Sequence, residues 1–291
     1  IGYFNAFIKA FPDINALARA REDRVMELWA GLGYYSRARN LHKTAKIISS
    51  QYGGVFPKSH SEIVALPGIG PSTAGAILSL GSNLEASILD GNVKRVLARY
   101  HRVKGHYSKT TVLKELWRLA KLHTPSEKNA VYTQAIMDIG ATVCTPKNPN
   151  CSICPISRHC EAFVNNEQLY FPEKKIKRPS KPEKNLVFLV YVNEKNEIFL
   201  AKRPSPGIWG GLWSFEECQD KSKIVSKAIK KHNRSATILR RLEKFKHTFS
   251  HYNLWITPII IDSPGSSKNY FPTTSLTKGV PAPVKKIIQS L

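Results

Sequence analysis

The stretch covering residues 66–99, LPGIGPSTAGAILSLGSNLEASILDGNVKRVLAR, constrains the fold of this chain more than any other. It predicts a short helix, a tight turn, a second helix beginning at Pro71, and a loop that carries Asp90 to a third helix. Proline suits the first position of a helix, where its missing N–H costs no hydrogen bond. Gly68 and Gly70 allow the sharp turn and let another molecule approach the backbone closely.

This helical hairpin has two interpretations. The N–H groups at the turn and at the following helix start form a natural phosphate site, because the first turn of a helix leaves its donors free. An ordinary hairpin with glycine in its turn is the alternative. Asp90 also has two interpretations, a helix N-cap or a carboxylate presented to a nucleic-acid sugar, and one residue can serve as both.

The charge balance indicates a polyanionic partner. Lys+Arg 44 against Asp+Glu 21 gives a formal net charge of +23, and nucleic acid is the usual partner for such an excess. A solvated basic surface and a membrane surface are the alternatives, but no strongly amphipathic basic helix favours the membrane. The 291 residues, 42% of them hydrophobic, predict two globular domains. No apolar run approaches the roughly 20 residues that span a bilayer, and no signal peptide opens the chain.

Four of the five cysteines lie between residues 144 and 160 with the spacing C-x6-C-x2-C-x5-C. A disulfide framework would spread its cysteines along the chain, so this clustering predicts a metal centre in a reducing compartment. Structural zinc sites more often show two CxxC pairs, whereas one CxxC between longer arms suits a [4Fe–4S] cluster. Zinc is the second interpretation. The expected ligands are Cys144, Cys151, Cys154 and Cys160.

The chain changes its pattern once. Helical periodicity dominates residues 1–165, a segment rich in lysine and proline at 166–185 is typical of a linker, and residues 186–291 predict an α+β domain. Ser36 is expected to cap its helix. The expected helices are 1–10, a helix from 21 or 23 to 30, 36–50, 61–66, 71–81, 108–123, 125–142, 222–232 and 283–291. The expected strands are 186–192, 197–202, 212–215, 239–249 and 254–261.

Taken together, LPGIGPSTAGAI, the aspartate in ILDGNVKRVLAR and the cysteine pattern resemble the endonuclease III superfamily of DNA glycosylases. GLGYYSRARN, GIWGGLWSF and HTFSH narrow the resemblance to the adenine DNA glycosylases (MutY type), which remove adenine mispaired with 8-oxoguanine. The resemblance covers nearly the whole chain. It implies a multi-domain fold, in which an all-α helix-hairpin-helix catalytic domain with an iron–sulfur loop at 144–160 precedes an α+β Nudix-like domain.

The resemblance implies that Asp90 and Asn92 act in catalysis. Loss of adenine develops positive charge on the sugar, which the Asp90 carboxylate would stabilise, while a general acid protonates the leaving base. In the family this acid is a glutamate in a helix preceding the segment that matches residues 1–7, and the chain starts after it. We therefore expect these 291 residues alone to bind DNA but to lose most of the chemistry.

The resemblance also assigns DNA contacts, because a glycosylase must flip its target base out of the duplex. Tyr34 suits the wedge that fills the gap, although a core aromatic residue is the alternative. Superfamily members that cut the strand carry a lysine where this chain has Ser72, so the resemblance implies a monofunctional enzyme that uses water as nucleophile. First-turn capping is the alternative for this serine. The residues expected at the DNA are Tyr34, Arg37, Gly68, Gly70, Ser72 and Lys94.

The C-terminal domain resembles a Nudix fold without the R-E-x-x-E-E motif that would bind magnesium, so we interpret it as a binding module. Phe249, Ser250 and His251 match the family's loop that checks for 8-oxoguanine. The Ser250 hydroxyl can accept from the N7–H that distinguishes 8-oxoguanine from guanine, a discrimination of about 1–3 kcal/mol. A strand end with a capping serine is the alternative.

The function predicted is base-excision repair of adenine opposite 8-oxoguanine or guanine in double-stranded DNA, by a monomer that does not bind membranes. Two alternatives stay open: a non-catalytic fragment that binds the lesion pair, and a strand-cutting glycosylase/lyase on oxidised pyrimidines. Ser72 and the second domain argue against the lyase. The expected location is the bacterial cytoplasm, at the nucleoid, or the nucleus or mitochondrion of a eukaryote.

Overall fold

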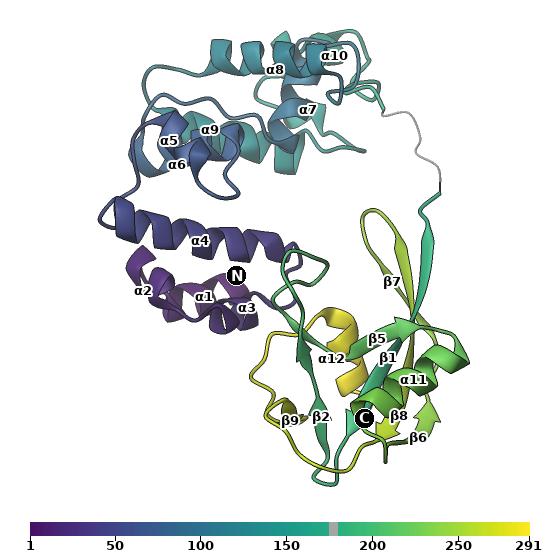
Figure 1. The fold of residues 1–291 in the computed structure, drawn as a ribbon. Helices are drawn as coiled ribbons and strands as arrows, with labels where there is room; N and C mark the ends of the chain where they lie inside the picture. The colour runs from purple at the N-terminus through teal and green to yellow at the C-terminus, as the bar shows by residue number, and fades with distance from the viewer. Residues whose placement is uncertain (175–179) are drawn as a thin grey trace. The chain divides into compact units, whose positions relative to one another are not determined.

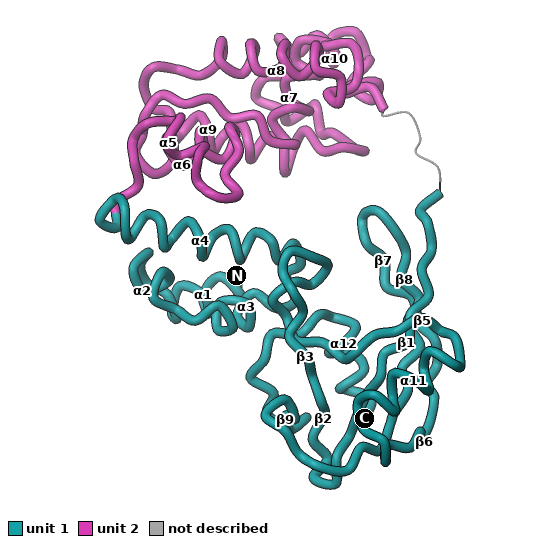
Figure 2. Tube along the Cα trace, viewed as in Figure 1, with its two compact units in different colours: residues 1–54, 179–291 teal, residues 55–178 magenta. Residues whose placement is uncertain are grey.

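The computed structural model describes residues 1–174 and 180–291. Contacts divide the chain into two compact units, which we call unit 1 (residues 1–54 with 179–291) and unit 2 (residues 55–178; Figure 2). This grouping differs from the division expected at residues 165 and 186, because the first four helices bury their apolar side chains with those of the C-terminal sheet. Residues 175–179 of the expected linker lie outside the described residues.

Unit 1 begins with helices that were largely expected. The short helix α2 (Ile14–Arg19) was not expected. Asp13 caps it by accepting a hydrogen bond from the Ala16 N–H at 2.7 Å. Ser36 does not cap its helix: the N-cap is Tyr34, whose left-handed φ of 47° starts the helix one residue earlier. The helices are α1 (Gly2–Ala10), α2 (Ile14–Arg19), α3 (Glu22–Trp29) and α4 (Tyr35–Gln51).

The second part of unit 1 is a sheet of seven strands in the order β6-β8-β1-β2-β9, with β5 also paired to β1 and β7 to β8 (Figure 1). The parallel pair of β1 and β8 runs from Glu183↔Asn253 to Val192↔Asp262. A separate two-stranded sheet joins β3 and β4. The strands are β1 (Glu183–Val192), β2 (Glu197–Phe199), β3 (Ala201–Lys202), β4 (Trp213–Ser214), β5 (Glu216–Gln219), β6 (Thr237–Arg241), β7 (Phe245–Thr248), β8 (Asn253–Asp262) and β9 (Tyr270–Pro272).

Alternation along β1 gives the sheet two buried faces. Phe188 and Val190 join the core that contains side chains of α1 to α4 and of α12 (Ala282–Ile288). Leu189 and its alternate neighbours pack instead with α11 (Ser222–His232). The Lys202–Asp23 ion pair, at 2.6 Å, also joins the N-terminal helices to this part of the unit.

The prediction of a single strand at 239–249 is wrong, because this segment forms the two strands β6 and β7. Pro258 of β8 has no N–H for the ladder. β6 ends its pairing at Arg241↔Ile259, and β7 begins again at Phe245↔Ile256. The strand expected at 197–202 likewise divides into β2 and β3, which belong to different sheets.

Unit 2 is helical, as expected. Val96 and Leu97 of α7 pack against Leu116 of α8 in its main core. The helix expected from residue 125 begins at Asn129 instead, after a left-handed Lys128. The helices are α5 (His60–Ala65), α6 (Pro71–Ser82), α7 (Gly91–Tyr100), α8 (Thr110–His123), α9 (Asn129–Asp138), a π-helical turn (Ile139–Val143), two 3₁₀ turns (Cys151–Ile153, Ser157–His159) and α10 (Glu161–Val164). Across the part of the chain that is described, no helix has the length and apolar character to cross a membrane.

Candidate active site and metal centre

The hairpin between α5 and α6 forms as predicted. The Ile69 N–H donates to the Leu66 carbonyl at 3.2 Å, and Gly68 takes the left-handed φ of 77° that glycine tolerates best. Pro71 is the first residue of α6, and Gly70 is its N-cap, without a side chain to bind the first-turn donors. The first turn of α6 therefore has no side-chain cap.

Ser72 links this hairpin to the segment that carries Asp90. Its hydroxyl accepts a hydrogen bond from the Leu89 N–H at 3.0 Å, so it ties two segments together rather than capping its own helix. The next residue, Asp90, is the N-cap of α7, and its Oδ1 accepts from the Val93 N–H at 2.8 Å. The Asp90 carboxylate is thus fixed by Val93, and the residue that precedes it is fixed by Ser72.

Two glycines bring neighbouring helices against the same segment. A Cβ on Gly75 of α6 would overlap the carbonyl of Ser87, and a Cβ on Gly140 would lie 2.7 Å from the Cβ of Asn92. Such distances are too short for any other residue, so glycine is required at both positions by close packing. The segment from Ser87 to Asn92 is therefore enclosed by backbone on two sides.

Arg95, which the sequence analysis did not single out, connects this segment to the cysteine loop. Its Nη2 donates to Asn92 Oδ1 at 2.9 Å and to the Gly140 carbonyl, and its Nε donates to the Cys144 carbonyl at 2.7 Å. One guanidinium thereby joins the start of α7 to the first cysteine of the cluster.

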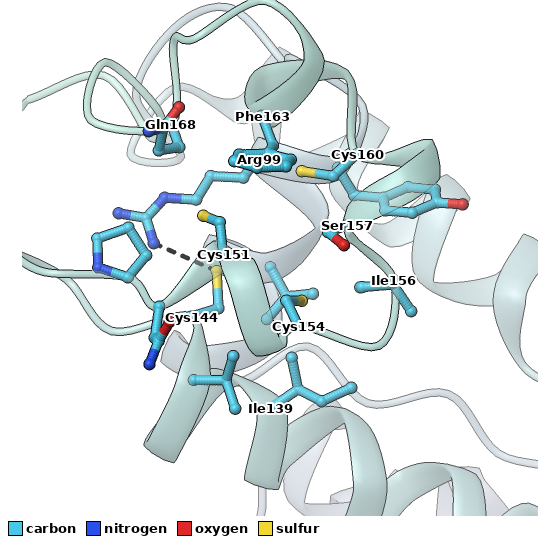
Figure 3. Close-up of a pocket in the computed structure, with 15 residues that line it drawn as sticks. Arg99, Ile139, Cys144, Cys151, Cys154, Ile156, Ser157, Cys160, Phe163 and Gln168 are labelled. Carbon is cyan, nitrogen blue, oxygen red and sulfur yellow. Dashed lines mark hydrogen bonds between the residues drawn. The ribbon is translucent and has the colours of Figure 1, made fainter.

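All four cysteines of the predicted metal site line one cavity, whose other walls include Ile139, Ile156 and Phe163 (Figure 3). Arg99, only 2% exposed, reaches its edge. Its guanidinium donates to the Cys144 Sγ at 3.2 Å and to the Thr145 carbonyl at 2.8 Å. A buried positive charge at this place offsets the negative charge of metal-bound thiolates.

The donor set of this cavity fits an iron–sulfur cluster better than a single zinc ion. A zinc ion needs four sulfurs about 2.3 Å from one point. Among residues 1–174 and 180–291, no three His, Cys, Asp or Glu side chains gather closely enough to hold one ion. Four cysteines spread around an apolar cavity suit a larger cluster. Burial raises the pKa of the Cys151 and Cys160 thiols, so metal binding releases their protons.

Unit 1 brings the predicted wedge and the predicted lesion loop to one cavity. Tyr34 and the residues Phe249, Ser250 and His251 all line it. Tyr34 is 70% exposed, so it is not a core residue, and the Arg37 guanidinium lies 4.6 Å from its ring centre. These segments are far apart in the sequence and meet only through the fold of unit 1.

The loop after β7 rests on aromatic side chains. The Phe249 ring lies 4.7 Å from the Tyr252 ring and 5.2 Å from the Trp209 ring, centre to centre. Trp209, 7% exposed, belongs to the core. Arg203 lies over its ring and makes two hydrogen bonds to Glu217, at 2.8 and 3.1 Å. The loop that carries Ser250 therefore has a packed base.

The chain matches three family models. Residues 1–122 match the HhH-GPD superfamily base excision DNA repair protein, residues 144–160 the iron-sulfur binding domain of endonuclease III, and residues 187–290 the NUDIX domain. The adenine DNA glycosylase of Buchnera aphidicola subsp. Baizongia pistaciae is 42% identical over 100% of this chain and 84% of its own length. The chain belongs to the adenine DNA glycosylase family. The human adenine DNA glycosylase is 32% identical over 87% of this chain and 56% of its own length.

A solved structure of a thermostable thymine-DNA glycosylase resembles this member of the adenine DNA glycosylase family with a TM-score of 0.50 and 26% identity, over 56% of this chain and 76% of the other. The predicted fold class, a helix-hairpin-helix domain with a Nudix-like domain, is confirmed. The cofactor is a [4Fe–4S] cluster, and the residues that would hold it are the four that line the cavity, Cys144, Cys151, Cys154 and Cys160. As in its relatives, the activity is that of a DNA glycosylase, which hydrolyses N-glycosyl bonds.

The structure distributes the remaining predicted site residues of this family member over the two units. Unit 2 holds Asp90 and Asn92 with the hairpin residues, and unit 1 holds Tyr34 with the lesion loop. Lys94 Nζ lies 5.4 Å from the centre of the Tyr107 ring, where a phosphate contact stays a prediction. The sequence did not single out two arginines of α7, the half-buried Arg95 and the buried Arg99, because nothing local distinguishes them from the other basic residues.

Proposed function

We propose that this chain removes adenine that is mispaired with 8-oxoguanine or guanine in double-stranded DNA, without cutting the strand, as a monomer in the compartment that holds the genome. The proposal is carried by one observation: Asp90 is fixed at the start of α7, and the hairpin between α5 and α6 is tied to the preceding residue, through the Val93–Asp90 and Ser72–Leu89 hydrogen bonds. This arrangement supports a carboxylate that acts close to the hairpin for which we propose a DNA-backbone contact.

Asp90 has the chemistry that the glycosidic bond requires. As the bond between C1′ and adenine breaks, its electron pair leaves with the base, which takes up a proton from a general acid. The sugar becomes positively charged, and an anchored carboxylate stabilises that charge without having to reorganise. Water then adds to C1′ and gives up a proton. Ser72 supports this route, because its hydroxyl is no amine and already binds Leu89, so it forms no Schiff base.

The hairpin supports a phosphate contact. Gly70 has a φ of −93°, which any residue adopts, and a Cβ on it would meet no described atom within 4 Å beyond its neighbours. Neither strain nor internal packing therefore requires glycine there. A backbone left bare toward the outside suits close approach by a phosphate at the start of α6.

The cysteine loop has a supporting role in this proposal. When bound, the cluster supplies a rigid crosslink between the four cysteines that folds the loop. Arg95 hydrogen-bonds to both the Cys144 carbonyl and the Asn92 side chain. We infer that an ordered loop keeps Asn92, and through it the start of α7, in its working position.

Recognition of the opposite base is assigned to unit 1. Tyr34 and Ser250 line the same cavity, so an aromatic ring that fills a gap in the stack and a hydroxyl that tests a base edge act at one place. The Ser250 Oγ lies 3.4 Å from His251 Nδ1. A hydroxyl that donates to this nitrogen keeps its lone pairs for the N7–H of 8-oxoguanine.

The decisive experiment is single-turnover adenine release from a duplex with adenine opposite 8-oxoguanine, measured on this chain preceded by the helix that carries the general-acid glutamate in the family. Asp90→Asn should lower the rate by a factor on the order of 10²–10³ and preserve duplex binding, because asparagine still caps a helix but carries no charge. Asp13→Asn is the matched control, since Asp13 is also an N-cap, at α2, and should keep the full rate.

Three results would contradict the proposal. Equal rates for Asp90→Asn and the unchanged chain would remove Asp90 from the mechanism. Tight duplex binding without any release, even when the chain is preceded by the helix that carries the general-acid glutamate, would favour a protein that binds the lesion pair. A DNA adduct trapped by borohydride would favour strand cutting. For the opposite base, Ser250→Ala should narrow the preference for 8-oxoguanine over guanine, and an unaltered preference would return the loop to a structural role.

A further inference from the structure

We propose that Lys181 is a positioning residue for the lesion loop, Phe249–Ser250–His251, so that the end of the linker sets how well that loop distinguishes the opposite base. From the sequence alone, Lys181 is one lysine of a basic, solvated segment, with no specific role. The effect on base discrimination rests on the function proposed for Ser250, whereas the effect on the loop's own structure does not.

The backbone beside the loop carries the first argument. β1 and β8 pair in parallel from Glu183↔Asn253, and the Asn253 N–H donates to the Pro182 carbonyl at 2.9 Å. The chain that arrives from the linker therefore lies directly along the chain that leaves the lesion loop, as the adjacent ends of the two strands show in Figure 1. Residues 181 and 182 are held there by main-chain pairing.

The side chain of Lys181 carries the second argument. Its ammonium donates to the carbonyl oxygen of Phe249 at 2.8 Å. That carbonyl belongs to the peptide plane between Phe249 and Ser250, and fixing this plane leaves only rotation about the N–Cα bond of Ser250 to set the direction in which its side chain leaves the backbone. On its other side, the Phe249 N–H donates to the Tyr252 carbonyl at 2.9 Å. The residue before Ser250 is therefore held at both its polar backbone groups.

A second lysine of the same segment completes the brace. Lys184 Nζ lies 4.8 Å from the centre of the Tyr252 ring, which itself packs on Phe249. Two ammonium groups on residues 181 and 184 thus contact the two ends of the loop, one at a carbonyl and one at an aromatic face. Contact with DNA phosphate alone would not explain why the Lys181 ammonium donates to the Phe249 carbonyl.

The test compares Lys181→Met, which keeps the length of the side chain and loses the ammonium, with Lys181→Arg, which restores a donor. Lys195→Met is the matched control, because Lys195 is exposed in the β1–β2 hairpin. The first measurement is amide hydrogen exchange of the free protein at residues 249–253. Lys181→Met should exchange roughly three- to five-fold faster there, since an exposed charge-assisted bond is worth about 1 kcal/mol or less. The arginine variant and the control should match the unchanged chain.

The second measurement is the ratio of affinities for two duplexes, with a non-hydrolysable adenosine analogue opposite 8-oxoguanine or opposite guanine, over a series of salt concentrations. Lys181→Met should lower this ratio roughly three- to five-fold, because it loosens the lesion loop. The salt dependence of the affinity should not change, because no phosphate contact is removed. Lys181→Arg should restore most of the ratio.

Unchanged exchange at residues 249–253 would overturn the proposal. An equal loss of affinity for both duplexes, with a salt slope reduced by about one, would also overturn it and make Lys181 a phosphate contact. Lys181→Met could instead speed exchange at residues 249–253 while both Lys181→Met and Ser250→Ala leave the affinity ratio unaltered. In that case Lys181 does position the loop, but the recognition of 8-oxoguanine proposed for the loop is wrong.

Discussion

The Ser72 hydroxyl accepts a hydrogen bond from the Leu89 backbone at 3.0 Å, and this bond couples the hairpin between α5 and α6 to the residue that precedes Asp90. The two residues lie on different segments of unit 2, and Asp90 follows Leu89 directly. The proposed function requires the hairpin, which would bind phosphate, to keep a fixed distance from the Asp90 carboxylate, which would stabilise the sugar. The bond between Ser72 and Leu89 supplies part of that constraint.

Replacing Ser72 by alanine should therefore slow adenine release more than it weakens duplex binding. The Leu89 N–H loses its partner at a cost of about 1–3 kcal/mol, and Asp90 loses one of its two anchors. We expect single-turnover release to fall roughly ten-fold while duplex affinity changes less than three-fold. Ser226→Ala, at an exposed position of α11, is the control. Parallel losses in rate and affinity would show that Ser72 acts on binding alone.

Arg95 should matter for both the cluster and the chemistry. Arg95→Gln removes donors from the Asn92 side chain and from the Gly140 and Cys144 carbonyls at once. Partly buried acceptors left without donors cost about 1–3 kcal/mol each. We expect less iron per protein in the purified variant, and slower adenine release per remaining cluster. The control is Arg118→Gln, because the exposed Arg118 bonds only across one turn to Glu115.

Full iron content together with a normal rate in Arg95→Gln would contradict this link. A reduced iron content with a normal rate per cluster would limit Arg95 to holding the loop. The two measurements on one sample therefore separate a role in cluster retention from a role at the start of α7.

Two glycines of unit 2 should respond in opposite directions to alanine. A Cβ on Gly140 would lie 2.7 Å from Asn92, and overpacking of this kind costs about 1–3 kcal/mol. Gly81, inside α6, would meet nothing within 4 Å, and alanine there favours the helix by about 0.5–1 kcal/mol. Denaturant unfolding should show a loss for Gly140→Ala and a gain for Gly81→Ala. Adenine release should fall only in the former.

Local signals predicted the parts of this fold that depend on neighbouring residues. Pro71 starts α6, and α11 runs from Ser222 to His232 as its pattern of apolar and lysine residues indicated. The four clustered cysteines pointed to the cavity that they line. In each case the determining side chains lie within a few residues of the feature, so the one-dimensional pattern contains the physical cause.

Features that depend on a partner far away in the chain could not be predicted from the sequence. The break between β6 and β7 is caused by Pro258, which lies on a different strand. The hydrogen bonds of Arg95 and Arg99 reach carbonyls and a sulfur more than forty residues away. Neither residue stands out from the other basic residues of a chain with 44 lysines and arginines. Periodicity says which face of α7 is buried, but not which charge the interior needs.

A pair of histidines makes unit 2 sensitive to acid. The Nε2 atoms of His101 and His123 lie 2.7 Å apart, so one ring donates to the other and at least one ring is neutral. Burial, with a smaller contribution from the charge of His123, lowers the pKa of His101. A histidine whose pKa is lower in the folded than in the unfolded chain contributes stability that is present above its unfolded pKa of about 6.5. That stability is lost as the pH falls through the lower, folded pKa.

The midpoint of thermal unfolding should therefore decrease on acidification from about pH 7.5 to about pH 5.5, and it should decrease less in His101→Gln. Glutamine can still exchange a hydrogen bond with His123 but takes up no proton. His42 and His247, whose pKa values burial also lowers, remain in the variant, so part of the acid sensitivity should persist. Identical pH dependence in the two proteins would show that the 2.7 Å contact between the rings carries no proton-linked stability.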